Sequence, residues 1–321
     1  MNSTRLRAMS HRGLLFLLVA FFFATALRVP NNLGNSSFEQ THLKRRLDNA
    51  IARPYRDQVN HPGIELAEWG YVALREELQR LGDLMKSFCS QSGVACLQDA
   101  VEIEVTYMRL RYVKPKVVWE ISPSHGFSTL VILSALLANE NGAMLYSFDV
   151  QDISTKYLSA PEFQPLTKKW RLIEGDVRDN VFLPGGDLKF ARPDYLFLDS
   201  FHSATFGKFY VTALLPEIQR AHTYVSLHDV YNPSFWSDEK SGRDIAVYPA
   251  FLPNEEGIVV LDWLNYRYLS DACNLYTFAP SKLSNAPFLS SLLTLRKKAG
   301  IPHFESSAVE STIFFELGCR M

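Results

Sequence analysis

The feature that most constrains this chain is a series of short apolar segments between residues 116 and 229. The segments are KVVWEIS (116–122), AMLYSFDV (143–150), WRLIEGD (170–176), DYLFLDS (194–200) and TYVSLHD (223–229). Stretches with helical character separate them, notably 127–138, which Asn141-Gly142 closes, and 204–221. Buried strands that alternate with helices predict right-handed βαβ units and an α/β fold, a Rossmann-like, mostly parallel twisted sheet with helices on both faces.

Acidic residues at the ends of these strands predict a binding site. Ligands of open parallel sheets bind at the carboxyl ends of the strands. Each of the five segments ends in or beside an acidic residue, and these are Glu120, Asp149, Asp176, Asp199 and Asp229. An acidic residue at the end of all five strands is more than turns after strands would usually give. We therefore expect these side chains to converge on one edge of the sheet.

Two helices are expected before the sheet. Apolar residues recur at helical spacing over 64–88, and a second helix is expected over 97–112, before Lys114-Pro115. The sequence therefore predicts one domain over 63–321. Its parts are a helical lead-in (63–115), a core sheet (116–280) and a C-terminal extension (281–321).

The C-terminal third is harder to assign. The segments 257–264, 274–280 and 311–317 resemble three further strands whose order the pattern leaves open. Residues 231–256, with several prolines, are interpreted as a long loop over the ligand edge, and loops of that length are usually functional lids or disordered.

The N-terminus has the properties of a targeting segment. Residues 13–27, GLLFLLVAFFFATAL, carry no charge and follow an arginine-rich stretch. As a helix they would span roughly 22 Å at ~1.5 Å per residue, less than the ~30 Å hydrocarbon core. Ala24-Thr25-Ala26 fits signal-peptide cleavage, whereas the positive flank fits an uncleaved type II anchor. We expect residues 1–28 to be a signal peptide or a signal-anchor, with an organelle transit peptide as the minority alternative, and 29–62 to be a polar stem.

Two further features are consistent with the secretory pathway, either in an endomembrane or secreted. Asn35-Ser36-Ser37 is a glycosylation sequon just after the apolar segment. The chain has four cysteines, for which disulfides 89–96 and 273–319 are one interpretation and four free thiols the other. Contact with a membrane would then occur through the N-terminal segment if it stays uncleaved.

The charge distribution argues against nucleic acid as a partner. The chain has 33 basic and 34 acidic residues, but Arg5, Arg7, Arg12 and Arg28 all precede the first acidic residue, Glu39. Removing these four leaves 29 basic residues against 34 acidic ones, a formal charge of −5 for the rest of the chain. Nucleic-acid binding driven by phosphate neutralisation is therefore disfavoured.

The first strand leads into the turn EISPSHGFST, which begins at Glu120. With the order of the elements that follow, residues from about 100 to 280 resemble class I S-adenosylmethionine-dependent methyltransferases. The closest likeness is to the small-molecule and sugar O-methyltransferases with Asp-x-x-His after the fourth strand. The resemblance implies that this turn wraps the methionine part of the cofactor, through Glu120, Ser122, Ser124 and Gly126. Serine stands at two positions where the family more often has glycine; its hydroxyl can donate to the cofactor, but a positive φ would strain it.

Two further acidic residues are expected on the cofactor. Asp149 lies 23 residues after Gly126, close to the ~20-residue spacing of the acid that binds ribose hydroxyls. By resemblance, Asp176 contacts the adenine amino group. For both residues the alternative is a structural aspartate that caps a helix or marks a turn.

The fourth and fifth strands carry the most specific signal. Asp199 and His202 are three residues apart, and His228-Asp229 ends the next strand. The resemblance implies that Asp199 and Asp229 are ligands of a divalent metal such as Mg²⁺ and that His202, beside Asp199, is the general base, with a helix cap as the alternative for His202. His228 stands where an acidic ligand is often found, and histidine suits softer ions than Mg²⁺.

The sequence thus predicts an S-adenosylmethionine-dependent O-methyltransferase that acts on a hydroxyl of a sugar, glycan or other small polar acceptor. The imidazole of histidine, with an ordinary pKa near ~6.5, suits removal of the acceptor proton. One alternative is a non-catalytic binding or scaffold protein with this fold. A nicotinamide-dependent oxidoreductase is disfavoured because that turn would need G-x-G-x-x-G and contains only Gly126.

Overall fold

The structure is a computed structural model of the chain. It describes residues 62–92, 98, 100–219, 222–233, 236–238, 243–245, 251–253, 255–267, 272–278, 287–301 and 311–318. The chain divides into two compact units, 1–45 and 46–321, and every described residue belongs to the second. The predicted targeting segment, the sequon and residues 29–61 of the stem lie outside the described residues. No helix among the described residues is long and apolar enough to cross a membrane.

One large sheet organises the second unit. Its strand order is β3 (Trp170–Glu174), β2 (Met144–Asp149), β1 (Val117–Ile121), β4 (Tyr195–Leu198), β5 (Thr223–Pro233), β10 (Ser311–Leu317) and β9 (Ala272–Phe278). The first five strands are parallel, and β10 is antiparallel to both of its neighbours. The predicted Rossmann-like, mostly parallel sheet is therefore confirmed, with the order 3-2-1-4-5 of the doubly wound fold.

Short strands extend the sheet near the end of β5. Strand β8 (Phe251–Pro253) pairs antiparallel with the last residues of β5. Strands β6 (Trp236–Asp238) and β7 (Arg243–Ile245) form a separate two-stranded sheet. The segment 231–256, predicted as a continuous loop, thus contains short strands. Strand β5 extends to Pro233, and its last residues pair with β8.

Hydrophobic cores cover both faces of the large sheet. In β1, Val118 belongs to one core and the next residue, Trp119, to the other. In β2, Leu145 and Phe148 are divided between the two cores in the same way. Successive side chains of a strand point to opposite faces, so an unbroken apolar strand such as VVWEI requires cover on both sides. This explains why the strands are nearly continuous apolar runs.

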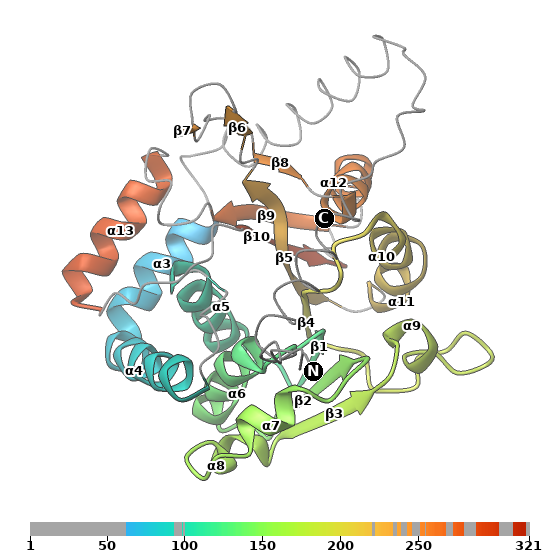
Figure 1. Cartoon of the computed structure of the whole chain (residues 1–321), viewed down its shortest axis with the longest axis horizontal. Coiled ribbons are helices and arrows are strands. Elements are labelled where there is room, and N and C mark those ends of the chain that lie inside the picture. The colour runs from blue at the N-terminus through green and yellow to red at the C-terminus, as the bar shows by residue number, and fades with distance from the viewer. Residues whose placement is uncertain are drawn as a thin grey trace, which may run out of the picture. The chain divides into compact units, whose positions relative to one another are not determined.

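Helices supply that cover from two sides (Figure 1). On one side lie α3 (Pro62–Ala73), α4 (Arg75–Ser92), α5 (Ala100–Val113), α6 (Phe127–Asn139) and α13 (Pro287–Ala299). On the other lie α10 (Ala204–Phe209), the π-helical turn Tyr210–Leu214, α11 (Leu215–Ile218) and α12 (Glu255–Arg267). The short helices α7 (Ser154–Leu158), α8 (Gln164–Thr167) and α9 (Val177–Asn180) follow β2 and β3.

The largest correction concerns 257–264, which the sequence predicts as a strand and which forms helix α12. A short apolar run fits a buried strand and a buried helix equally well. In the structure Val260, Leu261 and Leu264 are buried, and this spacing of one and four residues is that of a helix face. The acidic pair Glu255-Glu256 occupies the first turn, where negative charge stabilises a helix.

Smaller differences concern the helices. The helix predicted over 64–88 is two helices, α3 and α4, that meet at Leu74, and the helix predicted over 204–221 is interrupted by the π-helical turn. The strands predicted over 274–280 and 311–317 are confirmed as β9 and β10. Their order could not be predicted, and β10 inserts between β5 and β9.

Cys89 in α4 is disulfide-bonded, and no described cysteine is free. The alternative of four free thiols is therefore wrong. Cys96 and Cys319 lie outside the described residues, so the pairings 89–96 and 273–319 stay predictions.

Candidate active site

The site lies where the strand order reverses, at the carboxyl end of β1. Strand β1 pairs with β2 on one side and with β4 on the other. From β1, strands β2 and β3 extend the sheet in one direction, and β4 and β5 extend it in the other. Doubly wound sheets bind ligands in the crevice outside such a switch point. We call the carboxyl ends of β1, β2, β4 and β5, with the residues that directly follow them, the carboxyl edge.

Backbone hydrogen bonds hold the predicted residues together at this edge. The amide of Asp199 donates to the carbonyl of Ile121 at 3.1 Å, which fixes the end of β4 against the end of β1. The amide of Ser124 donates to Oδ2 of Asp149 at 3.1 Å, which fixes the turn after β1 against the end of β2. The structure therefore brings Glu120, Asp149 and Asp199 to one edge of the sheet.

The turn after β1 is strained. Ser122, Ser124 and Gly126 all have positive φ, at 64°, 49° and 89°. Glycine adopts this region freely, whereas serine does so only where surrounding structure enforces it. A Cβ atom at position 126 would also lie 2.9 Å from Cδ1 of Leu158, so α7 packs closely against the turn. Strain of this kind is typical of functional sites.

Glu120 supports this turn from behind. Its side chain is fully buried and accepts hydrogen bonds from Ser128 Oγ at 2.7 Å, Thr129 Oγ1 at 2.8 Å and Ser147 Oγ at 2.5 Å. Burial raises the pKa of Glu120 to about 7, although the three hydroxyl groups act in the opposite direction. In the structure the carboxylate is enclosed and anchors the first turn of α6, and the predicted contact of Glu120 with a cofactor stays a prediction.

Asp149 and Asp176 are placed differently from each other. Asp149 is half-buried at the edge, and among the described residues its Oδ1 and Oδ2 accept hydrogen bonds from the backbone amides of Gln151 and Ser124. Asp176 is the N-cap of α9, accepts from the amide of Arg178, and forms an ion pair with the Arg178 guanidinium. That ion pair lowers the pKa of Asp176. These contacts fit the alternative of a structural aspartate, and the contact of Asp176 with adenine stays a prediction.

A β-bulge aims two consecutive residues of β5 at the edge. Ser311 of β10 faces Tyr231, but Ile313 faces Leu227, so residues 228–230 oppose the single residue 312. Asp229 in this bulge has a φ of 53°, a left-handed conformation that aspartate tolerates better than most residues. Neighbouring residues in a regular strand would point to opposite faces.

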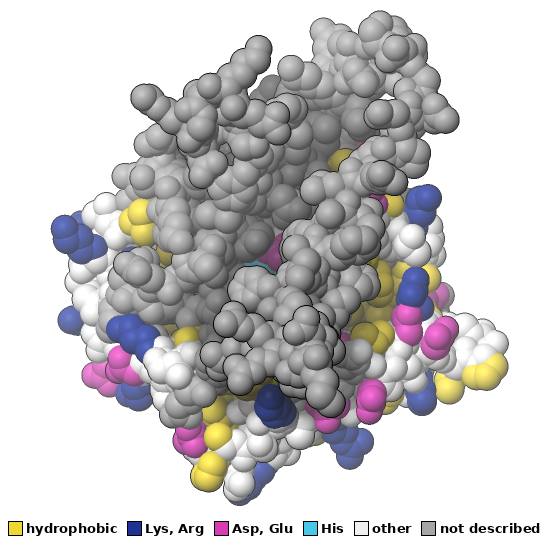
Figure 2. Space-filling view, viewed as in Figure 1, with side chains coloured by type: hydrophobic (Ala, Val, Ile, Leu, Met, Phe, Trp, Pro, Cys, Tyr) yellow, Lys and Arg dark blue, Asp and Glu magenta, His cyan; other side chains and the backbone are white. Residues whose placement is uncertain are grey.

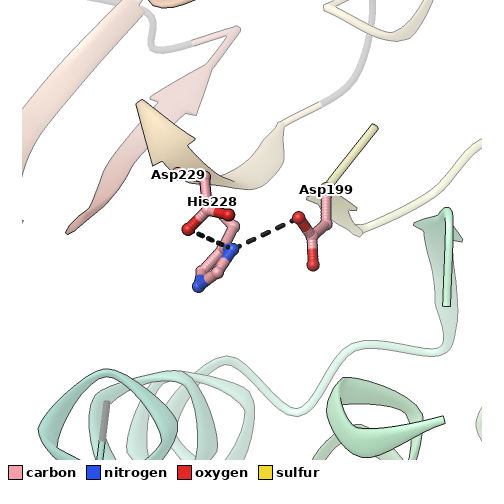
Figure 3. Close-up of side chains that lie close together, drawn as sticks. All are labelled: Asp199, His228 and Asp229. Atoms are coloured by element: carbon pink, nitrogen blue, oxygen red, sulfur yellow. Dashed lines mark hydrogen bonds and ion pairs between the residues drawn. The ribbon is translucent and has the colours of Figure 1, made fainter. Parts of the chain in front are cut away.

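As a result, His228 and Asp229 point toward the same place. Nδ1 of His228 lies 2.8 Å from Oδ1 of Asp229 and 3.2 Å from Oδ1 of Asp199 (Figure 3). The ligand atoms of Asp199, His228 and Asp229 lie within 4.8 Å of one another. Behind this group, Nε2 of His228 lies 3.6 Å from Oε2 of Glu102, a buried residue of α5.

This donor set fits a divalent cation. Two carboxylates and one imidazole are typical ligands of Mn²⁺, Fe²⁺, Co²⁺ and Zn²⁺, whereas Mg²⁺ prefers oxygen atoms alone. A carboxylate behind the second nitrogen of a ligating histidine is also usual in metal sites.

His202 lies beside the same carboxylates. Its Nδ1 is 2.9 Å from Oε2 of Glu256, and its Nε2 is 3.4 Å from Oδ2 of Asp229 and 3.7 Å from Oδ1 of Asp199. Burial lowers the pKa of His202, but its bonds to Asp229 and Glu256 and the charge of Asp199 outweigh this and raise the pKa to about 10. The sequence predicts that the imidazole of His202 has an ordinary pKa. With the raised pKa, the imidazole is protonated at neutral pH. It can accept a proton only when the neighbouring carboxylates carry less negative charge.

The pKa of His228 is raised as well. Burial opposes its charge, yet Asp229 and Asp199 raise the pKa of His228 well above its usual value. The pKa of Asp229 is lowered by the adjacent His228 despite burial. The cluster is thus a set of mutually stabilised charges. In the space-filling view, a histidine and an acidic side chain reach the surface near the centre of the face shown (Figure 2).

Residues 120–230 match a family described as "Methyltransferase domain". The matched range begins at Glu120 and ends directly after Asp229, so it contains all of the site residues predicted from the sequence. The chain carries a methyltransferase domain. Comparison with curated proteins finds no match.

Solved structures of methyltransferases resemble the chain more weakly. The O-methyltransferase TomG of Streptomyces achromogenes, involved in tomaymycin synthesis and solved with SAM, is 12% identical, with 74% of this chain and 90% of that chain covered at a TM-score of 0.46. An O-methyltransferase of Bacillus cereus solved with SAH is 11% identical, with 78% and 99% covered at a TM-score of 0.48.

The methyltransferase domain alone does not supply the whole site. Glu256 contacts His202 and Ser200 from helix α12, and Glu102 faces His228 from α5, and both lie outside the matched range. Glu256 lies in a segment predicted as loop and strand, so its position could not be predicted. The signal for Glu102 is weak: an acidic residue in the apolar stretch of a helix that is buried on most sides.

A cavity of about 720 Å³ lies elsewhere in the same unit. It is lined by residues of α4, α5 and α6, among them Glu77, Leu81, Tyr107 and Leu137. None of its lining residues belongs to the carboxyl edge, so its size does not bear on the assignment of the site.

The buried carboxyl of Glu120 leads to the first prediction. Because its folded-state pKa of about 7 exceeds the ordinary value of 4.5, its contribution to stability is full below pH 4.5 and is lost as pH rises to about 7. The loss amounts to about 3 kcal/mol. Urea unfolding of Glu120→Gln should lack this loss, so the variant should gain stability relative to the natural protein between pH 5 and pH 8.

The exposed Glu162→Gln is the matched control, and its stability relative to the natural protein should not change with pH. A Glu120→Gln difference that is the same at pH 5 and pH 8 would contradict the account of Glu120.

Proposed function

We propose that this protein is an S-adenosylmethionine-dependent O-methyltransferase that methylates a hydroxyl of a sugar, glycan or other small polar acceptor. One observation carries the proposal. In the methyltransferase domain, the strained turn after β1 and the carboxylate of Asp149 lie on the same sheet edge as the cluster of Asp199, His202, His228 and Asp229. A cofactor site and a proton-accepting site must adjoin in this way for methyl transfer.

The cofactor end of the site is built from β1, α6 and β2. Asp149 accepts hydrogen bonds from the two ribose hydroxyls. The hydroxyls of Ser122 and Ser124, and the backbone of Gly126, contact the methionine part. Helix α6 begins directly after Gly126 with no side-chain cap, and the partial positive charge of its N-terminus favours the methionine carboxylate.

The acceptor end is built from β4 and β5. The acceptor oxygen attacks the methyl carbon of the sulfonium in line; the C–O bond forms as the C–S bond breaks, and S-adenosylhomocysteine leaves. The hydroxyl proton passes to Nε2 of His202, the ring nitrogen on the side of Asp199 and Asp229. A cation held by these two carboxylates would offset their negative charge and leave the imidazole neutral for this step. Alignment of the two reactants in one crevice supplies much of the rate.

Asp199, Asp229 and His228 would hold a divalent cation. When bound, the cation supplies positive charge that orients and acidifies the acceptor hydroxyl. Asp199 and Asp229 would hold the cation and also lie beside Nε2 of His202, so the acceptor and its base would share these two carboxylates.

The alternative of a non-catalytic scaffold explains the structure less well. Ser122, Ser124 and Asp229 all have positive φ, and the edge holds several buried charges. Each of these features destabilises the fold, and such features are retained where function requires them. A nicotinamide site is disfavoured, because the turn replaces the expected glycines with Ser122 and Ser124.

The secretory pathway is the proposed location. The disulfide at Cys89 supports it, since disulfides persist in oxidising compartments. The apolar segment 13–27 and the sequon at Asn35 support it from the sequence. This location requires that the cofactor, which is made in the cytosol, be carried across a membrane.

Cofactor binding gives the second prediction. Asp149→Ala should weaken binding of S-adenosylhomocysteine by about 10- to 100-fold, because it removes charge-assisted hydrogen bonds worth about 1.5–3 kcal/mol. Calorimetric titration of the full chain measures this affinity. Asp152→Ala is the matched control: Asp152 lies three residues away and its Oδ1 accepts a hydrogen bond from the amide of Thr155 in α7, so the affinity of this variant should stay at the natural value. Absence of heat with the natural protein would leave the scaffold alternative ahead.

Turnover gives the third prediction. With methyl-labelled S-adenosylmethionine and a panel of sugars and small hydroxyl compounds, the natural protein should label at least one acceptor. Asp199→Asn and His202→Gln should each lower turnover by about 100-fold, the usual scale of general base catalysis, with cofactor affinity unchanged. Retention of full turnover by both variants would exclude this acceptor site.

Metal preference gives the fourth prediction. Because His228 contributes nitrogen, calorimetry of the full chain should show Mn²⁺ binding about tenfold or more tightly than Mg²⁺. His228→Asp creates an all-oxygen donor set and should narrow this preference. Equal affinities of the natural protein for the two ions would contradict the assignment of His228 as a ligand.

A further inference from the structure

A buried carboxylate from outside the matched domain completes the surroundings of His202. Glu256, the second residue of α12, is 1% exposed. Its Oε2 lies 2.9 Å from Nδ1 of His202, and its Oε1 accepts a hydrogen bond from Oγ of Ser200 at 2.9 Å. Both oxygens of Glu256 are thus engaged by the segment that follows β4.

The two nitrogens of the His202 ring face different groups. Nδ1 faces Glu256 on α12, and Nε2 faces Asp229 and Asp199 at the carboxyl edge. Because the contact with Glu256 fixes the His202 ring at Nδ1, Nε2 stays directed at the carboxyl edge. In such carboxylate–imidazole pairs, the carboxylate sets both the orientation of the ring and the nitrogen that exchanges the proton.

We propose that Glu256 is a positioning residue of the reaction, which holds His202 with Nδ1–H bound to α12 and Nε2 directed at the acceptor hydroxyl. This inference rests on the proposed function. From the neutral ring, which carries its proton on Nδ1, Nε2 takes the hydroxyl proton while Nδ1–H stays with Glu256. Glu256 touches neither acceptor nor cofactor and acts only through His202.

The packing of α12 on α10 explains how Glu256 reaches this place. A Cβ atom on Gly207 would lie 2.9 Å from Cβ of Val259 and 3.1 Å from the carbonyl oxygen of Glu256. Glycine in α10 therefore permits an approach of the two helices that any larger residue would prevent. Oε2 of Glu255 also accepts from the amide of Ala204 at 3.3 Å, which ties the start of α12 to the start of α10.

The neighbouring acidic residues offer a matched pair of variants. Glu255 and Glu256 begin the same helix, carry the same charge, and differ in that Glu256 contacts His202. Glu256→Gln keeps the size of the side chain and removes its charge; Glu255→Gln removes the same charge from an exposed position. Glu256→Asp restores a carboxylate on a shorter side chain.

The test combines histidine NMR with kinetics on the full chain. With ¹⁵N-labelled histidine, the natural protein should show a downfield, slowly exchanging Nδ1–H proton that disappears in His202→Gln. This signal should be lost in Glu256→Gln and kept in Glu255→Gln. With the acceptor found in the labelling panel, Glu256→Gln should lower kcat by about 100-fold with KM nearly unchanged. Glu256→Asp should recover part of the loss, and Glu255→Gln should stay within about threefold of the natural kcat.

The outcomes separate this inference from the proposed function. If the natural protein binds cofactor but lacks the Nδ1–H signal, or if Glu255→Gln and Glu256→Gln behave alike, the positioning role is overturned and the proposed function stands. If the natural protein shows the signal but binds no cofactor, the pairing of Glu256 with His202 stands and the proposed function fails. The natural protein shows whether the signal is present and His202→Gln assigns it to His202, so the test does not depend on the folding of a Glu256 variant.

Discussion

The structure depends on the parallel pairing of β1 with β2 and β4. Residues Val118 to Ile121 of β1 pair with both neighbours, so the three strands end close to one level. Glu120, Asp149 and Asp199 are therefore brought together although 29 to 79 residues separate them in the chain. The amide of Asp199 on the carbonyl of Ile121 continues this alignment by one residue past the last strand pair. Without it, the acidic residues would be a scattered set of turn residues.

The two cores stabilise the sheet, and destabilising features gather at its carboxyl edge. Ser122, Ser124 and Asp229 adopt left-handed backbone conformations there, and Glu120 is buried beneath the turn. The histidines are charged at the same edge because carboxylates surround them. Such a concentration of strain and charge needs the rigid apolar support that strands covered on both faces provide. The bulge in β5 shows the same principle, since it gives up regular pairing to aim His228 and Asp229 at one place.

Much of this arrangement could be predicted from the sequence. Apolar runs that alternate with helices fix the class of the sheet, and the rule that ligands bind at strand carboxyl ends locates the edge. Local pattern could not distinguish strand from helix over 257–264, since apolar residues at positions 260, 261 and 264 fit either until their neighbours are known. Glu256 was missed for that reason. Its contact with His202 depends on the close packing of two helices at Gly207, which is a tertiary feature.

Roles were harder to predict than positions. Glu120 and Asp176 lie where the pattern places them, at the ends of β1 and β3, but three hydroxyls enclose the first and Arg178 pairs with the second. Whether a carboxylate at a strand end faces a ligand or the protein is decided by side chains from other elements. The sequence does not indicate that the hydroxyls of Ser128, Thr129 and Ser147 bind Glu120, because each is an ordinary residue of its helix or strand.

A crystal structure of the full chain with S-adenosylhomocysteine would test the central claim most directly. We expect the adenosyl group across the carboxyl ends of β1 and β2, with its ribose hydroxyls on Asp149 and its sulfur toward the side of Asp199 and His202. A ligand bound instead in the cavity between α4 and α6, or one whose ribose lies away from Asp149, would contradict the account.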